Sequence, residues 1–106
     1  MWSVTYLDDD AKAEVEALPA DMRASFGRIV ELVRAYGLEH MREPYAKHVE
    51  GKLLEMRMTG RDGIARAFYV AASGRRVVVL RTFVKKTPKT PRREIELALT
   101  RAREVQ

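Results

Sequence analysis

Cationic side chains in the carboxyl-terminal half of the chain are the residues best suited to chemistry. Between Lys85 and Arg93, five of nine positions are Lys or Arg and none is acidic. Pro91, within this segment, is expected to open a last helix. The exposed N–H groups and dipole at a helix start would favour acids by a few tenths to ~1 kcal/mol. Cations at this place therefore indicate an anion site, with phosphate as the obvious anion, and a solvated basic linker is the alternative.

Three arginines carry a second argument for an anion site. Arg57, Arg66 and Arg81 each fall inside a predicted strand, among apolar residues. Three arginines on consecutive strands could converge on one face of a sheet, where they would repel one another unless an anion filled the cluster. Tyr69 could add a stacking surface or a hydroxyl group. The alternative is that these arginines are edge residues or partners of Glu55.

The residue types that are absent narrow the chemistry further. The chain has no cysteine and only two histidines, His40 and His48. This excludes disulfides, thiol catalysis and metal clusters built from cysteine or several histidines. Neither Gly51-Lys52 nor residues 60–63 have the glycine spacing of a phosphate-binding loop. We therefore expect neither a metal nor another cofactor.

Length and composition favour one globular domain over residues 1–106. Hydrophobic residues make up 46% of the chain and charged residues 33%, with a net charge of +5, as in folded rather than disordered proteins. No apolar run approaches the ~20 residues that a membrane-spanning helix needs, and the amino terminus lacks the pattern of a secretory signal. The expectation is a cytoplasmic protein with no membrane partner and a polyanion-facing carboxyl-terminal half.

Hydrophobic spacing predicts the elements that must position these cations. We expect strands at residues 2–7, 52–58, 64–71 and 77–84, helices at residues 11–18 and 19–36, and a last helix from residue 91. Residues 38–51 read as irregular. The side chains of residues 8–10 offer capping oxygens to the first helix, and Gly37 is expected to stop the second.

The same spacing predicts which faces are apolar. One apolar stripe on the second helix is expected to contain Met22, Phe26, Ile29, Val33 and Tyr36. In the strand at residues 52–58, one face is expected to carry Leu54, Met56 and Met58, and the other Leu53, Glu55 and Arg57.

The predicted fold class is α+β in the order β-α-α-β-β-β-α, with a helical hairpin and a final helix packed on a small, twisted, mainly antiparallel sheet.

Three motifs resemble a known family. Residues 47–57 (KHVEGKLLEMR) resemble the "K-H-L-x-x-x-L-W-E-L-R" strand of HigB-like toxins in the RelE/ParE superfamily. Residues 63–69 (GIARAFY) are similar to the "G-x-x-R-x-x-Y" strand of that family. Residues 83–91 (FVKKTPKTP) are similar to the "F-x-K-K-T-x-K-T-P" signature of its phage-derived branch. The resemblance follows the chain in order over nearly its whole length.

This resemblance implies a RelE-like fold and the toxin half of a type II toxin–antitoxin pair. Family members cleave mRNA, usually on the translating ribosome, and need no metal ion. They use the RNA's own 2′-hydroxyl as the nucleophile on the adjacent phosphate. The implied partners are mRNA, the ribosome and a cognate antitoxin, expected to be a helix-turn-helix protein encoded by the adjacent gene.

The resemblance also assigns roles to residues. Arg66 is the expected group for phosphate stabilisation, with Arg57 and Lys86 as catalytic companions. The general base and acid stay unassigned, because Leu53 and Glu55 stand where some relatives carry lysines and the tail lacks the histidine or tyrosine that others use. The candidates for these roles are Glu55, His48 and Lys52. The residues expected to bind RNA are Lys85, Lys89, Tyr69, Arg81, Arg61 and Arg92.

Other functions stay open at this point. The superfamily includes gyrase-directed toxins that share the fold and do not cut RNA, and fold alone does not fix function. A basic phage-derived protein could also bind nucleic acid without cleaving it, which would give salt-sensitive binding alone. A third possibility is a degenerate toxin that keeps its antitoxin contact without activity.

Overall fold

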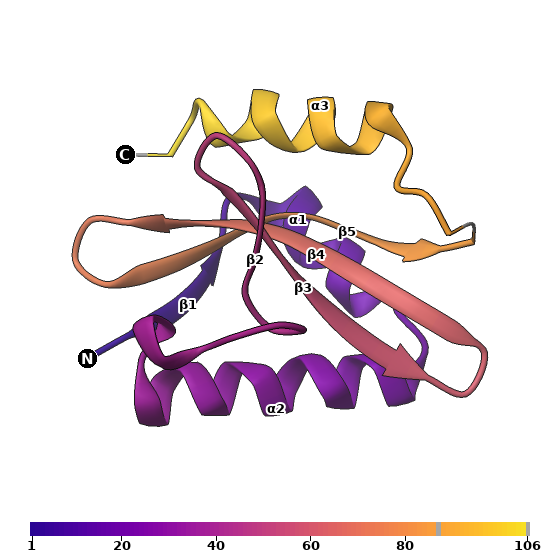
Figure 1. Ribbon diagram of the computed structural model, residues 1–106, viewed down its shortest axis with the longest axis horizontal. Helices are drawn as coiled ribbons and strands as arrows, with labels where there is room; N and C mark the ends of the chain where they lie inside the picture. Colours follow the sequence, from indigo (N-terminus) through magenta and orange to yellow (C-terminus); the bar gives the residue numbers. More distant parts are fainter. Residues whose placement is uncertain (87, 106) are drawn as a thin grey trace.

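The computed structural model describes residues 1–86 and 88–105 and shows one sheet between helices (Figure 1). Thr87 of the FVKKTPKTP motif lies outside the described residues. The elements along the chain are β1 Ser3–Tyr6, α1 Asp9–Glu16, α2 Ala20–Tyr36, a 3-10 turn at Leu38–His40, β2 Lys47–Glu50, β3 Leu53–Gly60, β4 Gly63–Ala72, β5 Arg76–Lys85 and α3 Arg92–Ala102.

The five strands form a sheet in the order β1-β5-β4-β3-β2. β1 runs parallel to β5, and the other neighbouring pairs are antiparallel. α2 covers one face of this sheet, and α3 lies across the other (Figure 1). The α+β fold class and the mainly antiparallel sheet predicted from the sequence are confirmed.

The two amino-terminal helices begin and end where local signals place them. The Asp8 side chain accepts a hydrogen bond from the Ala11 N–H at 2.9 Å, which caps α1. α2 follows Pro19 and stops at Gly37, whose φ of +87° suits a residue without a side chain. Tyr36, predicted to continue the apolar stripe of α2, is instead 64% exposed. A three-residue step falls about 60° short of a full helical turn, so the stripe drifts off the core at its end.

One apolar core fills the space between α2 and the sheet. Residues of β3 alternate as predicted, so that Met56 and Met58 face this core and Glu55 and Arg57 face the other side. The fully buried members contributed by α2 and the strands include Met22, Ile29, Val33, Met56, Met58, Ala65, Ala67, Tyr69, Val77 and Val79. In the part of the chain that the structure describes, no helix has the length and apolar character needed to cross a membrane.

A second, smaller core lies under α3 on the opposite face. It contains Leu53, Phe68, Val70, Val78, Leu80 and Ala98. Ala98 is the buried residue of α3, and Ile95, Leu99 and Ala102 pack against this core only in part. This face is therefore only partly covered by apolar contacts, and its remaining area carries polar side chains.

The strand β2 was not predicted from the sequence. Residues 38–51 were expected to be irregular, and the next strand was expected to begin at Lys52. The structure instead has a strand at Lys47–Glu50, where Lys47 lies opposite Glu55 and His48 opposite Leu54. The four-residue segment KHVE is too short and too polar to show the two-residue hydrophobic period of a strand. It forms a strand because β3 supplies its hydrogen-bonding partner.

Candidate active site

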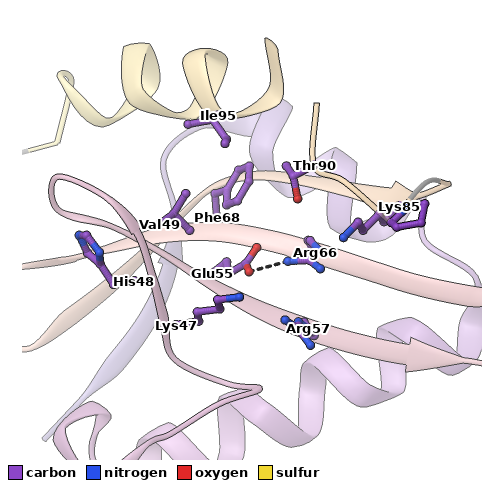
Figure 2. Close-up of a pocket in the computed structure, with 11 residues that line it drawn as sticks. Lys47, His48, Val49, Glu55, Arg57, Arg66, Phe68, Lys85, Thr90 and Ile95 are labelled. Carbon is purple, nitrogen blue, oxygen red and sulfur yellow. Dashed lines mark hydrogen bonds and ion pairs between the residues drawn. The ribbon is translucent and has the colours of Figure 1, made fainter. Parts of the chain in front are cut away.

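A pocket of about 410 Å³ opens on the α3 side of the sheet, between the edge strand β2 and the segment that leads into α3 (Figure 2). Its floor comes from β3 and β4, and its walls come from β2, the end of β5 and the first turn of α3. The lining residues are Lys47, His48, Val49, Glu55, Arg57, Arg66, Phe68, Lys85, Pro88, Thr90 and Ile95.

Four strands each contribute one cation to this pocket. Arg57 of β3 lies directly opposite Arg66 of β4 in the antiparallel register. Directly opposed residues share a face, and like charges there are destabilising unless something compensates them. Lys47 of β2 and Lys85 of β5 complete the set. The backbone N–H of Arg57 donates to the Pro44 carbonyl at 2.9 Å, which holds β3 at this position.

One buried acid organises the arginine at the centre of the pocket. Glu55 is 3% exposed, and its Oε1 accepts a hydrogen bond from Arg66 Nη1 at 2.5 Å. Arg66 itself is 8% exposed, and its Nε is buried without a hydrogen-bond partner among the described residues. A guanidinium has five N–H donors in a fixed fork. The ion pair therefore fixes the orientation of Arg66 and leaves donors for a second anion.

Lys85 lies in an unusual electrostatic environment for a lysine. Partial removal from water lowers the pKa of its ammonium group, and the positive charges of Arg66, Arg57 and Lys47 lower that pKa further. The negative charge of Glu55 opposes this effect only in part. The amine of Lys85 points toward the guanidinium of Arg66 in Figure 2.

The remaining polar groups define what the pocket can do. His48 is held at the rim, where its Nε2 lies 2.8 Å from the carbonyl oxygen of Gly51. Over residues 1–86 and 88–105, no group of three or more His, Cys, Asp or Glu side chains is arranged to hold a metal ion. With four cations around a single carboxylate, the pocket suits an oxyanion such as a phosphodiester, which guanidinium groups bind through two oxygens at once.

Several residues expected at the site lie near the pocket or inside it. Arg57, Arg66 and Lys85 line it. Lys86 lies just outside, where it borders an adjoining hollow together with Gly63, and Lys89 belongs to the segment that leads into α3. Of the cations in the FVKKTPKTP motif, Lys85 thus lies in the wall of the pocket and Lys86 borders the adjoining hollow.

Tyr69, Arg61 and Lys52 lie elsewhere. Tyr69 is fully buried on the α2 side of the sheet, and its hydroxyl donates to the Tyr45 carbonyl at 2.9 Å. Burial raises the pKa of this hydroxyl, and Tyr69 reaches neither Arg66 nor a substrate on the other face. Arg61 is exposed in the turn between β3 and β4. Lys52 sits in the turn after β2 and borders a different hollow, near Ala102.

The expected convergence of three strand arginines holds for Arg57 and Arg66 but not for Arg81. The Nη1 of Arg81 lies 2.8 Å from Glu14, and its Nε donates to Glu94 at 2.9 Å, away from the pocket lining. A β-bulge between β4 and β5 shifts the register beside Arg81. The carboxylates of Glu14 in α1 and Glu94 in α3 hold the guanidinium of Arg81 in ion pairs. These ion pairs explain why Arg81 does not line the pocket.

Arg92 is likewise committed to an ion pair. Its guanidinium donates to both oxygens of Glu50, at 2.6 and 3.1 Å, and also pairs with Glu96. Side-chain hydrogen bonding and the charge of Glu50 raise the pKa of Arg92. Arg92 therefore links the end of β2 to the start of α3 beside the pocket and is not among its lining residues.

Sequence reasoning missed Lys47 as a site residue, although it opens the KHVEGKLLEMR motif. Its contribution depends on β2, the strand that was not predicted. Pairing of Lys47 with Glu55 across β2 and β3 places it on the pocket face. The sequence does carry a signal for this placement. If the chain turns back at Gly51, the alternate residues Lys47 and Val49 before the turn share one face of the sheet with Glu55 and Arg57 after it.

Comparison with known proteins first defines the class of fold. A solved structure of a mutant of the E. coli toxin RelE in the free state has a TM-score of 0.64 to this chain at 15% sequence identity, over 94% of this chain and 96% of that one. The fold is therefore RelE-like. No curated protein matches the chain by sequence.

The family follows from the sequence. The family of phage-derived Gp49-like proteins matches residues 13–103, and the chain belongs to this family. Together with the RelE-like fold, this match confirms the resemblance to the phage-derived branch of the RelE-like toxins that the three motifs indicated.

Proposed function

We propose that this chain is the toxin of a type II toxin–antitoxin system and that it is a metal-independent endoribonuclease acting on mRNA. The observation that carries the proposal is the pocket in which Lys47, Arg57, Arg66 and Lys85 surround the single carboxylate of Glu55. An excess of cations is costly to assemble unless a polyanion compensates it. The RelE-like fold and the Gp49-like family support RNA as that polyanion, because the toxins that the three motifs resemble act on mRNA.

The proposed reaction is attack of a ribose 2′-hydroxyl on the adjacent phosphate. The phosphate gains negative charge in the transition state, and preorganised donors stabilise that charge without reorganisation. Arg66, oriented by Glu55, lines the pocket and would bind phosphate oxygens with the donors that this ion pair leaves free. Arg57, opposite it on β3, supplies the second guanidinium. Lys86 and Lys89 would hold the RNA strand where it leaves the pocket.

The ribosome is proposed as the setting for this reaction. The pocket supplies charge stabilisation but has few groups that would orient a flexible RNA strand. Holding reactants in a near-attack geometry can lower a barrier by up to about 7–11 kcal/mol. A translating ribosome would provide that positioning by presenting mRNA in a fixed path, which places the proposed activity in the cytoplasm.

An antitoxin is the proposed protein partner. An acidic segment that covers the pocket face would compensate the charges of Lys47, Arg57, Arg66 and Lys85 and block RNA at the same time. A helix-turn-helix protein encoded beside this gene would support the proposal. Binding of that protein should abolish cleavage in a purified system.

The direct test is expression of the chain alone, followed by mapping of RNA 5′ ends. We expect growth arrest and new cuts inside translated messages. Arg57→Ala should relieve toxicity and reduce cleavage because it removes one guanidinium from the pocket. Arg28→Ala, which changes an exposed arginine of α2, is the matched control and should stay toxic. Both variants should show the circular dichroism spectrum and melting temperature of the native chain.

Other outcomes would point to the alternative functions. Intact transcripts together with altered DNA supercoiling would identify a gyrase-directed toxin. Salt-sensitive RNA binding without cuts would identify a nucleic-acid-binding protein. Absence of toxicity with retained antitoxin binding would identify a degenerate toxin.

A further inference from the structure

We propose that Lys85 is the general base of the reaction and accepts the proton of the attacking 2′-hydroxyl. This inference rests on the proposed function and assigns the proton-transfer role that the sequence leaves open. It makes Lys85 a catalytic residue rather than one that only attracts RNA.

Elimination within the pocket leads to Lys85. Arg57 and Arg66 cannot give up a proton at any ordinary pH. Glu55 is committed to its buried ion pair with Arg66. The ring of His48 points away from Glu55 and Arg66, toward the Gly51 carbonyl that its Nε2 contacts (Figure 2). Two lysines remain as groups that can exchange a proton and reach the centre of the pocket.

The two lysines differ in what surrounds them. Lys47 lies opposite Glu55 in the register of β2 and β3, so a carboxylate offsets its charge. Lys85 stands at the other wall, on the last residue of β5, and its amine points toward Arg66 (Figure 2). It borders the main pocket and both hollows beside it, so it can be reached by RNA entering from that side.

Charged groups on every neighbouring element bear on the proton of Lys85. Arg66 on β4, Arg57 on β3 and Lys47 on β2 favour the neutral amine, and Glu55 on β3 opposes them. At the start of α3, Arg93 and Glu94 border the hollow on its other side. The lowered pKa of Lys85 increases the fraction of neutral amine at neutral pH, which is the form that a base requires.

The chemical step balances with this assignment. The neutral amine of Lys85 takes the 2′-hydroxyl proton and becomes an ammonium, while the 2′ oxygen forms a bond to phosphorus. The bond from phosphorus to the 5′ oxygen breaks, and that oxygen takes a proton from water. The products are a 2′,3′-cyclic phosphate and a 5′-hydroxyl end, and Lys85 returns its proton to solvent.

The first test separates the charge of Lys85 from its ability to lose a proton. Lys85→Arg keeps the positive charge but cannot act as a base. We expect single-turnover cleavage of mRNA on purified translating ribosomes to fall about 10²- to 10⁴-fold, the usual contribution of general acid–base catalysis. Saturation with ribosomes should occur at the same concentration. Lys12→Arg, on the exposed surface of α1, is the matched control and should cleave at the native rate.

The second test uses the absence of cysteine in this chain. Lys85→Cys introduces one reactive thiol, which can be alkylated with bromoethylamine to rebuild a lysine-like amine. The same thiol can be given a trimethylammonium group, which carries a fixed charge and no exchangeable proton. We expect the amine to restore cleavage and the trimethylammonium group not to restore it. With the rebuilt amine, the rate of cleavage should also reach its plateau at a lower pH than in the native chain, because the sulfur atom makes this amine less basic than lysine.

The results distinguish this inference from the proposed function. Native-like cleavage by Lys85→Arg, or recovery with the trimethylammonium group, would mean that Lys85 supplies charge alone, and would overturn the inference while the ribonuclease proposal stands. A native chain that cuts no message would remove both. Loss of cleavage in Lys85→Arg, with recovery only through the rebuilt amine, would establish Lys85 as the base.

Discussion

Two clusters of ionic side chains lie along the strands of this sheet, and they differ in their balance of charge. The pocket has four cations, Lys47, Arg57, Arg66 and Lys85, around the one carboxylate of Glu55. The second cluster joins α1, β5 and α3, and there two glutamates face two arginines. Its members are Glu14, Arg81, Glu94 and Arg101.

The second cluster also satisfies the backbone of β5. β1 pairs with β5 only as far as Val79, so the edge of β5 lies open beyond that point. The Thr82 N–H donates to Glu14 at 3.2 Å, and Arg101 donates to the Leu80 carbonyl at 2.7 Å. These contacts protect an edge that would otherwise expose unpaired groups. The role of this cluster is therefore structural.

Two strand arginines that look alike in the sequence, Arg66 and Arg81, differ in what surrounds them. Arg81 has a carboxylate on each side, and these hydrogen bonds raise its pKa. Arg66 has one carboxylate and a cation opposite it, at Arg57. A pocket with an excess of one charge favours ligand binding, whereas a cluster of balanced charges favours a structural role. The following changes test this distinction.

The largest effect is expected from Arg66→Ala. This change removes the central phosphate donor, and loss of one preorganised donor typically costs about 10²–10³ in rate. It also leaves Glu55 buried without its partner, which should destabilise the fold by about 3–5 kcal/mol. Cleavage on ribosomes and urea denaturation measure the two effects separately.

A double variant keeps the test of Arg66 independent of folding. Glu55→Leu combined with Arg66→Met replaces the buried pair by apolar side chains, an exchange that is often neutral for stability. We expect this variant to melt near the native temperature and to remain inactive. Recovery of cleavage together with stability would show that Arg66 acts only through the fold.

A smaller effect, on the stability of the fold and not on the rate of cleavage, is expected from Glu14→Ala. Glu14 holds Arg81, Arg101 and the Thr82 N–H. Its loss should cost about 1–3 kcal/mol, less than a fully buried pair, because water still reaches these side chains. Cleavage per folded molecule should stay at the native level below the melting temperature. A selective loss of activity at full stability would place this cluster in the active site.

The smallest effect is expected from Glu50→Gln, at the exposed pair with Arg92. The hydrogen bonds from Arg92 lower the pKa of Glu50. A carboxyl group with a lowered folded-state pKa contributes stability above its unfolded pKa and loses that contribution as the pH falls through the folded value. The native chain should therefore melt slightly above the variant at neutral pH, and the difference should vanish in acid. Thermal melts at several pH values measure this, and a pH-independent difference would contradict it.

Local signals in the sequence predicted most of the fold. The alternation of Leu54, Met56 and Met58 set the faces of β3, and the capping residue Asp8 and the stop at Gly37 bounded the first two helices. The strand β2 was not predicted, because a four-residue, mostly polar segment shows no hydrophobic period and forms a strand only by pairing with β3. Motif resemblance placed Arg57, Arg66 and Lys85 in the expected site but also selected Tyr69, which is buried on the other face.

The sequence by itself determined most of the elements, their faces and the family, because helical and strand periods and motif spacing are properties of neighbouring residues. It did not determine β2, which forms only against β3. Only the tertiary structure decided which charges meet. The register across β2, β3 and β4 placed Lys47, Glu55, Arg57 and Arg66 side by side. The ion pair with Glu14 of α1 held Arg81 outside the pocket. Electrostatic compensation depends on distance in space, and residues far apart in the chain set that distance only after folding.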